Sequence, residues 1–261
     1  MRGKLGTTGL PGLKISDVVA SGAVAYREFR PLPALSDVVL CTWERTVPRA
    51  EGAPAAQRVL PDGCVDLVWR GGGLWTAGPD TRAVMSPLMQ GETVVGIRMR
   101  PGAAGALLGL PASEIRDDRV PVGLLWAAAG DELTERLADA AHPSRQRQLL
   151  ERTLLRRRAD AEPPDALVAQ ALALLGRSGT RVGDLSRELA ISERQLLRRF
   201  RCAVGYGPKM ADRVLRFQRF VQRVPDVDGL ARVAADLGYS DQAHLTRECV
   251  ELSGLPPTQL L

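Results

Sequence analysis

Residues 182–201 read VGDLSRELAISERQLLRRFR, and this segment constrains the architecture of the chain more tightly than its other segments. Val182, Leu185 and Leu189 recur at the spacing that places side chains on one face of a short helix. The letters SERQ at residues 192–195 form a capping box, in which the serine side chain accepts a bond from the backbone at the glutamine and the glutamine reaches back. A second helix is therefore expected to begin directly after Ser192.

This second helix has two unlike faces. Leu196 and Phe200 are four residues apart and should point inward, whereas Arg194, Arg198 and Arg201 fall on one outward stripe. A short helix that braces a second one with a cationic outer edge is typical of a helix-turn-helix, whose second helix enters the major groove of DNA. An ordinary helical hairpin with a solvated face is the simpler alternative, and the cap and the one-sided arginines together favour the helix-turn-helix.

A similar unit recurs 48 or 49 residues further along the chain. Its first helix carries an apolar face and is followed by a glycine suited to ending a helix, and its second helix should begin near Asp241 with Leu245 and Cys249 inward. The apolar face consists of Leu230, Val233, Ala234 and Leu237. Residues 208–224 are predicted to form one long helix between the two units.

The two segments DLSRELAISERQLLRRFRCAVGYGPKMADRVLRFQRF and LARVAADLGYSDQAHLTRECVELSGLPP resemble the DNA-binding domain of the AraC/XylS family of transcription regulators. The resemblance covers about residues 180–261, under a third of the chain. It implies seven helices, with two recognition helices that enter successive major grooves on one face of the DNA.

The resemblance also implies which side chains face the bases. In the first unit they are Arg194, Leu197 and Arg198; in the second they are Gln242, Ala243, His244, Thr246 and Arg247. The expected DNA-contacting set leaves out Ala243, whose side chain is only a methyl group, and adds the cap residues and the neighbouring arginines. That set is Ser192, Arg194, Gln195, Leu197, Arg198, Arg199, Arg201, Gln242, His244, Thr246 and Arg247.

The two units differ in charge. Residues 187–223 hold ten Lys/Arg against three Asp/Glu, whereas residues 226–261 hold two against six. Attraction to phosphates supplies much of the affinity of a protein for DNA. The first unit is therefore expected to contribute most of the binding, and the second to be poorly equipped to bind alone.

Residues 23–100 carry strand signals. Thr93, Val95, Ile97 and Met99 alternate with a second set of residues, and residues 38–47 and 64–70 are β-branched and aromatic between Gly/Pro turns. Helical patterns follow at residues 103–110, 124–140, 145–158 and 164–175. The expected class is α+β: an N-terminal antiparallel β-barrel or sandwich-like domain with following helices, then an all-α C-terminal domain with two helix-turn-helix units.

The expected organisation is a loose leader at residues 1–20, a sensing or dimerisation domain at 21–160, and the DNA-binding domain at 165–261. Residues 59–69 (VLPDGCVDLVW) and 96–104 (GIRMRPGAA) are similar to an uncharacterised domain found with this DNA-binding domain in actinobacteria, which brings no known ligand. A pocket for a small ligand is predicted on the strands. Its candidate residues are Trp43, Asp62, Asp66, Trp69, Arg98 and Arg100. The plainer alternative makes the tryptophans core, Asp62 a turn residue and the arginines partners of carboxylates.

Composition excludes several function classes. The four cysteines and two histidines have no metal-ligand spacing, so we expect no metal, no cofactor and no disulfide framework. No signal peptide and no apolar run of about 18 residues is found, which predicts a cytoplasmic protein without a membrane partner. The net charge of +5 favours a polyanionic partner.

The sequence thus predicts a DNA-binding transcription regulator, homodimeric, modulated by a small effector or by dimerisation, with double-stranded DNA and RNA polymerase as partners. Two alternatives stay open. A DNA-repair methyl acceptor would need an activated thiolate beside a histidine, and no Pro-Cys-His run exists, so no enzymatic activity and no catalytic residue is expected. An adaptor that has lost DNA binding would fit the acidic second unit.

Overall fold

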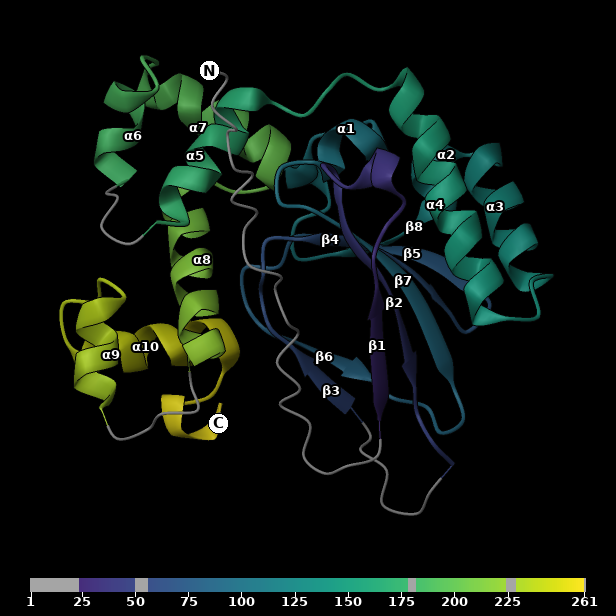
Figure 1. Cartoon of the computed structure of the whole chain (residues 1–261), viewed down its shortest axis with the longest axis horizontal. Coiled ribbons are helices and arrows are strands. Elements are labelled where there is room, and N and C mark those ends of the chain that lie inside the picture. Colours follow the sequence, from purple (N-terminus) through teal and green to yellow (C-terminus); the bar gives the residue numbers. More distant parts are fainter. Residues whose placement is uncertain (1–23, 50–55, 178–181, 224–228, 261) are drawn as a thin grey trace, which may run out of the picture.

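Six antiparallel strands form the main sheet of the N-terminal part, in the order β1-β2-β7-β4-β5-β8 (Figure 1). The computed structural model describes residues 24–49, 56–177, 182–223 and 229–260, so the leader expected at residues 1–20 lies outside the described residues. The strands are β1 (Ala25–Phe29), β2 (Val39–Thr46), β4 (Val65–Arg70), β5 (Gly73–Ala77), β7 (Thr93–Met99) and β8 (Arg119–Pro121). A 3-10 turn, η1 (Pro33–Leu35), follows β1.

The two faces of this sheet differ in chemistry. On β4, the side chains of Val65, Leu67 and Trp69 are buried in the main core, whereas Asp66 and Arg70 lie on the opposite face. The alternation predicted for residues 93–99 is confirmed, because every second residue from Val95 to Met99 joins the same core. One face of the sheet therefore packs on helices, and the other is partly polar.

The helices that cover the apolar face follow β7 in the chain. They are α1 (Ala104–Leu108), α2 (Val122–Trp126), α3 (Ala128–Ala138) and α4 (Pro143–Asp160), with the 3-10 turn η2 (Ala112–Glu114) after α1. The single helix predicted at residues 124–140 is wrong: the chain breaks at Ala127, whose φ is 47°. Gly123 and Gly130 allow the break, because a Cβ at Gly130 would lie 2.7 Å from the carbonyl oxygen of Val122.

A separate two-stranded sheet of β3 (Ala56–Val59) and β6 (Val84–Pro87) faces the polar side of the main sheet. The main sheet has β1 and β8 at its edges, and within the described residues these strands do not pair with each other. The predicted antiparallel sandwich-like arrangement is therefore confirmed, and a closed barrel is not formed.

The C-terminal part is all-helical, as predicted. Its helices are α5 (Ala166–Leu175), α6 (Val182–Glu188), α7 (Glu193–Val204), α8 (Pro208–Arg223), α9 (Leu230–Asp236) and α10 (Gln242–Ser253), and the 3-10 turn η3 (Pro257–Gln259) follows. Figure 1 shows α8 running from the α6–α7 pair to the α9–α10 pair. Each pair has its own apolar core, one around Phe200 and one around Phe217 and Leu245.

The β-rich and helical parts contact each other through backbone atoms and a few side chains. Gln218 on α8 donates a hydrogen bond to the carbonyl oxygen of Pro61 (2.7 Å), and Arg58 on β3 donates to that of Ser253 (2.8 Å). The backbone amide of Ala83 donates to the carbonyl oxygen of Leu252 (2.7 Å). Strand β3 and the residue before β6 therefore hold the C-terminal end of α10.

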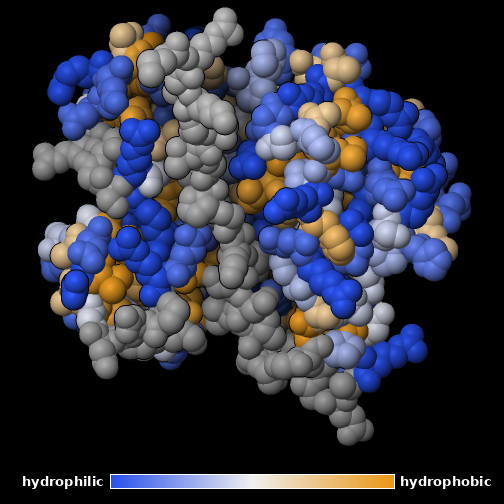
Figure 2. All heavy atoms as spheres, in the orientation of Figure 1, coloured by the Kyte–Doolittle hydropathy of each residue, from blue (hydrophilic) through white to orange (hydrophobic). Residues whose placement is uncertain are grey.

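The face shown in Figure 2 is mainly hydrophilic over α3 and α4. Two arginines of α4 contact neighbouring elements rather than solvent alone: Arg147 pairs with Glu44 of β2 at 2.7 Å, and the guanidinium of Arg157 lies 4.0 Å from the centre of the Trp126 ring of α2. Among the helices of the described ranges, none has the length and apolar character required to cross a membrane.

Candidate functional site

The first helix-turn-helix unit is held by the predicted capping box. The amide nitrogen of Gln195 donates to Ser192 Oγ at 3.2 Å, and that of Ser192 donates to Gln195 Oε1 at 3.0 Å. The turn before the cap contains Ala190 with a φ of 52°, a left-handed conformation that reverses the chain between α6 and α7. This local geometry fixes the start and direction of α7.

The outward face of α7 gathers the predicted arginines. Arg194, Leu197, Arg198 and Arg201 are all exposed and line one groove. The cap residues and Cys202 border the same groove, and its other wall is formed by Pro111, the residue before η2, and Ser113 within η2. Within the described part of the chain, none of the three arginines has an ion-pair partner. Their charge is therefore available to an external polyanion.

Arg199 has a different environment from its neighbours. Its Nη1 atom lies 2.7 Å from Asp165 Oδ2, and Asp165 also caps the first turn of α5. The side chain thus points to α5 rather than into the groove. Adjacent residues on a helix lie about 100° apart, so Arg199 points away from the stripe of Arg198, and its contact with DNA stays a prediction.

The second unit presents fewer free groups. The amide of His244 donates to the N-cap side chain Asp241 at 2.6 Å, and the ring of His244 contacts that of Tyr239 edge-on. The hydroxyl of Thr246 donates to the carbonyl oxygen of Gln242. Gln242 and Arg247 are exposed. Of the predicted residues, His244 and Thr246 are therefore partly committed to their own helix.

Ion pairs between α8 and α10 reduce the charge contrast between the two units. The buried carboxylate of Glu248 lies 3.0 Å from Arg213 and 3.1 Å from Arg216, and Arg213 also pairs with Glu251. These cations belong to the segment that is positive by sequence, and the carboxylates to the segment that is negative. Counting charges by segment therefore overstates the difference between the surfaces of the units.

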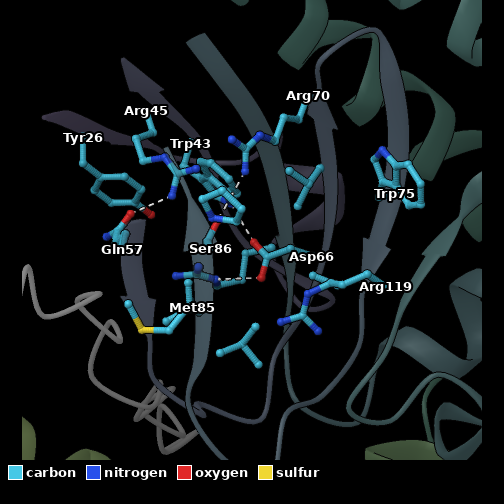
Figure 3. Close-up of a pocket in the computed structure, with 16 residues that line it drawn as sticks. Tyr26, Trp43, Arg45, Gln57, Asp66, Arg70, Trp75, Met85, Ser86 and Arg119 are labelled. Atoms are coloured by element: carbon cyan, nitrogen blue, oxygen red, sulfur yellow. Dashed lines mark hydrogen bonds and ion pairs between the residues drawn. The ribbon is translucent and has the colours of Figure 1, made fainter. Parts of the chain in front are cut away.

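A second candidate site lies in the β-rich part. A cavity of about 300 Å³ separates the main sheet from the β3–β6 sheet (Figure 3). Tyr26, Trp43 and Trp75 supply aromatic walls. Four arginines from different strands also line it: Arg45, Arg70, Arg98 and Arg119.

Three of the residues predicted from sequence meet in this cavity. Trp43 Nε1 donates to Asp66 Oδ1 at 2.6 Å, and Arg98 Nε donates to Asp66 Oδ2 at 3.2 Å. Burial raises the pKa of Asp66, although Arg98 counteracts this effect. Burial alone would lower the pKa of Arg98, but Asp66 and Asp62 outweigh it and raise that pKa. The Asp66–Arg98 ion pair joins β4 and β7 on the side of the cavity that the main sheet forms.

The other three predicted ligand residues lie elsewhere. Trp69 is buried in the main core on the opposite face of β4, because it follows Asp66 by an odd number of residues. Arg100 lies beyond the end of β7 and donates to the carbonyl oxygen of Ser36. Asp62 does not line the cavity; it accepts from the amide of Cys64 and lies 3.7 Å from Arg98, so it is a turn residue.

Sequence reasoning missed Arg45, Arg70 and Arg119. Arg45 is 6% exposed, and its Nη1 donates to Gln57 Oε1 at 2.6 Å. Burial and the nearby charge of Arg70 lower the pKa of Arg45 to about 10, which leaves it charged at neutral pH. A signal was available, since Cys41, Trp43 and Arg45 alternate on one strand face.

Comparison with known families gives two matches. Residues 185–261 match a model described as a helix-turn-helix domain. The C-terminal domain is an AraC-type helix-turn-helix domain. Residues 27–121 match a domain of unknown function, DUF6597, which contains nearly all of the strands that line the cavity.

Among solved structures, the chain is similar to ToxT from Vibrio cholerae. An apo variant from strain SCE256 is 10% identical, with coverage of 90% of this chain and 95% of that chain and a TM-score of 0.42. The unsaturated fatty acid-bound wild-type protein from the same strain is 9% identical, with coverage of 90% and 93% and a TM-score of 0.40. Among curated proteins, none matches the chain.

The buried cysteines of the chain give no support to a methyl acceptor. Cys41, Cys64 and Cys249 are buried, and Cys202 is exposed. Burial raises the pKa of Cys41 and of Cys249 to about 12, and that of Cys64 well above its usual value. Thiols with raised pKa values stay protonated and are poor nucleophiles.

Proposed function

We propose that this protein is a sequence-specific transcription regulator that binds double-stranded DNA through both helix-turn-helix units. The observation that carries the proposal is the groove face of α7, where Arg194, Arg198 and Arg201 are exposed without ion-pair partners among the described residues. Arginines on such a helix suit guanine edges in the major groove and the adjacent phosphates.

We propose an unequal division between the two units. Ala243 occupies the place in α10 that Arg194 occupies in α7, which removes one possible bidentate contact. Gln242 and Arg247 could still donate hydrogen bonds from the second unit. The operator should therefore have one strongly specified half, read by residues 192–201, and a weaker half about one helical turn away.

Selection from a pool of random-sequence duplexes with the full chain tests this proposal. We expect enrichment of a two-part motif with unequal information content, bound more tightly than unselected DNA in a mobility-shift assay at a fixed salt concentration. Failure to enrich any sequence, together with equal affinity for unselected DNA, would contradict sequence-specific regulation and favour the adaptor alternative.

The finer features of this function stay proposals. The N-terminal part is expected to sense a small ligand or to dimerise, because bacterial operators commonly mirror a two-fold axis. Sedimentation velocity of the full chain at micromolar concentration should show a dimer, and a strict monomer would contradict it. RNA polymerase stays an expected partner on the basis of sequence alone.

A further inference from the structure

Among the described residues, one buried cation of the cavity between the two sheets, Arg45, has no carboxylate at ion-pair distance. Three arginines that line the cavity are each matched by a carboxylate within 3.2 Å: Arg70 by Glu92, Arg98 by Asp66 and Arg119 by Asp80. Arg45 is matched only by the neutral amide of Gln57, and within the described residues its Nε has no acceptor. A buried charge without a counter-charge is costly, which favours the binding of an anion.

Of the remaining acidic groups, Glu92 is near enough to act on the charge of Arg45, but its carboxylate is already paired with Arg70 at 2.7 Å. Asp62 and Glu28 lie 3.7 and 3.9 Å from Arg98, not from Arg45. The strand register places Arg45 beside Val94, four residues from Arg98 along β7, which corresponds to roughly 13 Å. The unpaired positive charge therefore lies at the Arg45 end of the cavity.

Much of the remaining lining is apolar and aromatic. The rings of Tyr26 and Trp43 lie 6.0 Å apart at one end, near Arg45 and Gln57 (Figure 3). Trp75 and Met85, from opposite walls, are 40% and 51% exposed. Exposed aromatic and thioether surface beside a cavity of this volume suits a planar apolar body of modest size.

We propose that this cavity binds a small organic monocarboxylate with a flat, apolar body, and that its carboxylate pairs with Arg45. The binding of such a molecule does not depend on the function proposed above, but its role as an effector rests on that function. The carboxylate would supply the acceptors that Arg45 lacks, and the apolar body would lie between Trp43, Trp75 and Met85.

The wall of the cavity is also the segment that holds the second recognition helix. Met85 and Gln57 line the cavity, while Arg58 of the same sheet donates to the carbonyl oxygen of Ser253 at the end of α10. The amide of Ala83, next to β6, bonds to Leu252. A ligand that fixes β3 and β6 against the main sheet would therefore fix the position of α10.

Calorimetry with three carboxylates tests the binding step: benzoate, 2-naphthoate and indole-3-acetate, with 2-naphthamide as the neutral counterpart of naphthoate. We expect at least one carboxylate to bind and the amide to bind at least tenfold more weakly. Arg45→Gln should remove this discrimination, whereas Arg27→Gln, an exposed position on β1, should retain it. A thermal melt without ligand confirms that each variant is folded.

Binding of none of the three acids, or equal binding of naphthoate and naphthamide, overturns the ligand class. The regulatory step is tested separately with selected DNA. Naphthoate should change the DNA dissociation constant of the wild type at least threefold, and Arg58→Ala should bind naphthoate normally without that change. An unchanged dissociation constant in the wild type overturns the effector role. Loss of DNA binding without any ligand would instead contradict the proposed function and leave the calorimetric result intact.

Discussion

Gly96 on β7 leaves the space in which the indole of Trp43 lies. A Cβ at this position would be 2.3 Å from two ring atoms of Trp43, so alanine cannot fit without moving the ring away from Asp66. Overpacking of this kind typically costs about 1–3 kcal/mol. We expect Gly96→Ala to lower the free energy of unfolding by that amount in urea denaturation and to weaken ligand binding in the cavity.

Gly183 provides the matched control for this substitution. It is exposed on α6, and a Cβ there meets nothing within 4 Å. Gly183→Ala should stabilise the protein by about 0.5–1 kcal/mol, because alanine favours the helix. Equal effects of the two substitutions would contradict the close packing described for Trp43.

Arg198 and Arg199 are adjacent in sequence but differ in their partners. Arg198 lies in the groove, whereas Arg199 pairs with Asp165. Arg198→Ala should cost about 1–3 kcal/mol of specific DNA affinity. Arg199→Ala should leave DNA affinity nearly unchanged and lower the stability by less than about 1 kcal/mol, because the ion pair is partly exposed.

Mobility shifts on the selected operator measure the loss of DNA affinity of each variant, and urea denaturation measures the loss of stability. A larger loss of DNA affinity for Arg199→Ala than for Arg198→Ala would show that the groove face is not the surface that binds DNA.

The helices α7 and α10 begin with similar side-chain caps but differ in what they offer to DNA. We expect Arg198→Ala to reduce specific affinity more than Arg247→Ala on one operator, since α10 has Ala243 in place of Arg194. Arg201→Ala should flatten the dependence of the logarithm of affinity on that of salt by about one unit. Binding titrations at several salt concentrations separate these effects.

A larger loss of specific affinity for Arg247→Ala than for Arg198→Ala would assign the stronger half-site to α10. Equal losses would mean that the ion pairs of Glu248 with Arg213 and Arg216 largely cancel the charge contrast between the units.

Local patterns predicted the helices of the C-terminal part well and the cavity poorly. The capping box at Ser192 and the inward Leu245 depend on spacings within one or two turns, so the sequence reveals them. The pairing of Arg199 with Asp165 joins residues 34 apart, and the cavity needs β3 to face the main sheet. Trp69 does not belong to the cavity, because it shares its face of β4 with Leu67 in the main core, and this alternation can be read in the sequence.

The groove beside α7 lies between the two parts of the molecule, since Pro111 and Ser113 share it with the recognition helix. Cys202 is exposed at the edge of this groove, while burial keeps the other three thiols protonated. We expect a thiol reagent at mildly alkaline pH to modify Cys202 alone, and a bulky maleimide adduct there to weaken DNA binding several-fold.

Mass spectrometry of the labelled protein identifies the modified thiol, and Cys202→Ser should abolish rapid labelling while retaining DNA binding. Rapid modification of Cys41 or Cys64 in the folded protein would contradict their burial. Unchanged DNA binding after complete labelling of Cys202 would place the DNA away from this end of α7.

The contact between Ala83 and Leu252 involves only main-chain atoms. Side chains at both positions can therefore vary without removing it, and an alanine scan would not detect it. The amide proton of Ala83 is instead a natural reporter, because it is released to solvent only when the loop and α10 separate. Its rate of exchange with deuterium reports how readily the loop before β6 separates from α10, and the measurement needs no mutation. A bound carboxylate that fixes β6 should slow that exchange, and cognate DNA that draws α10 away should hasten it.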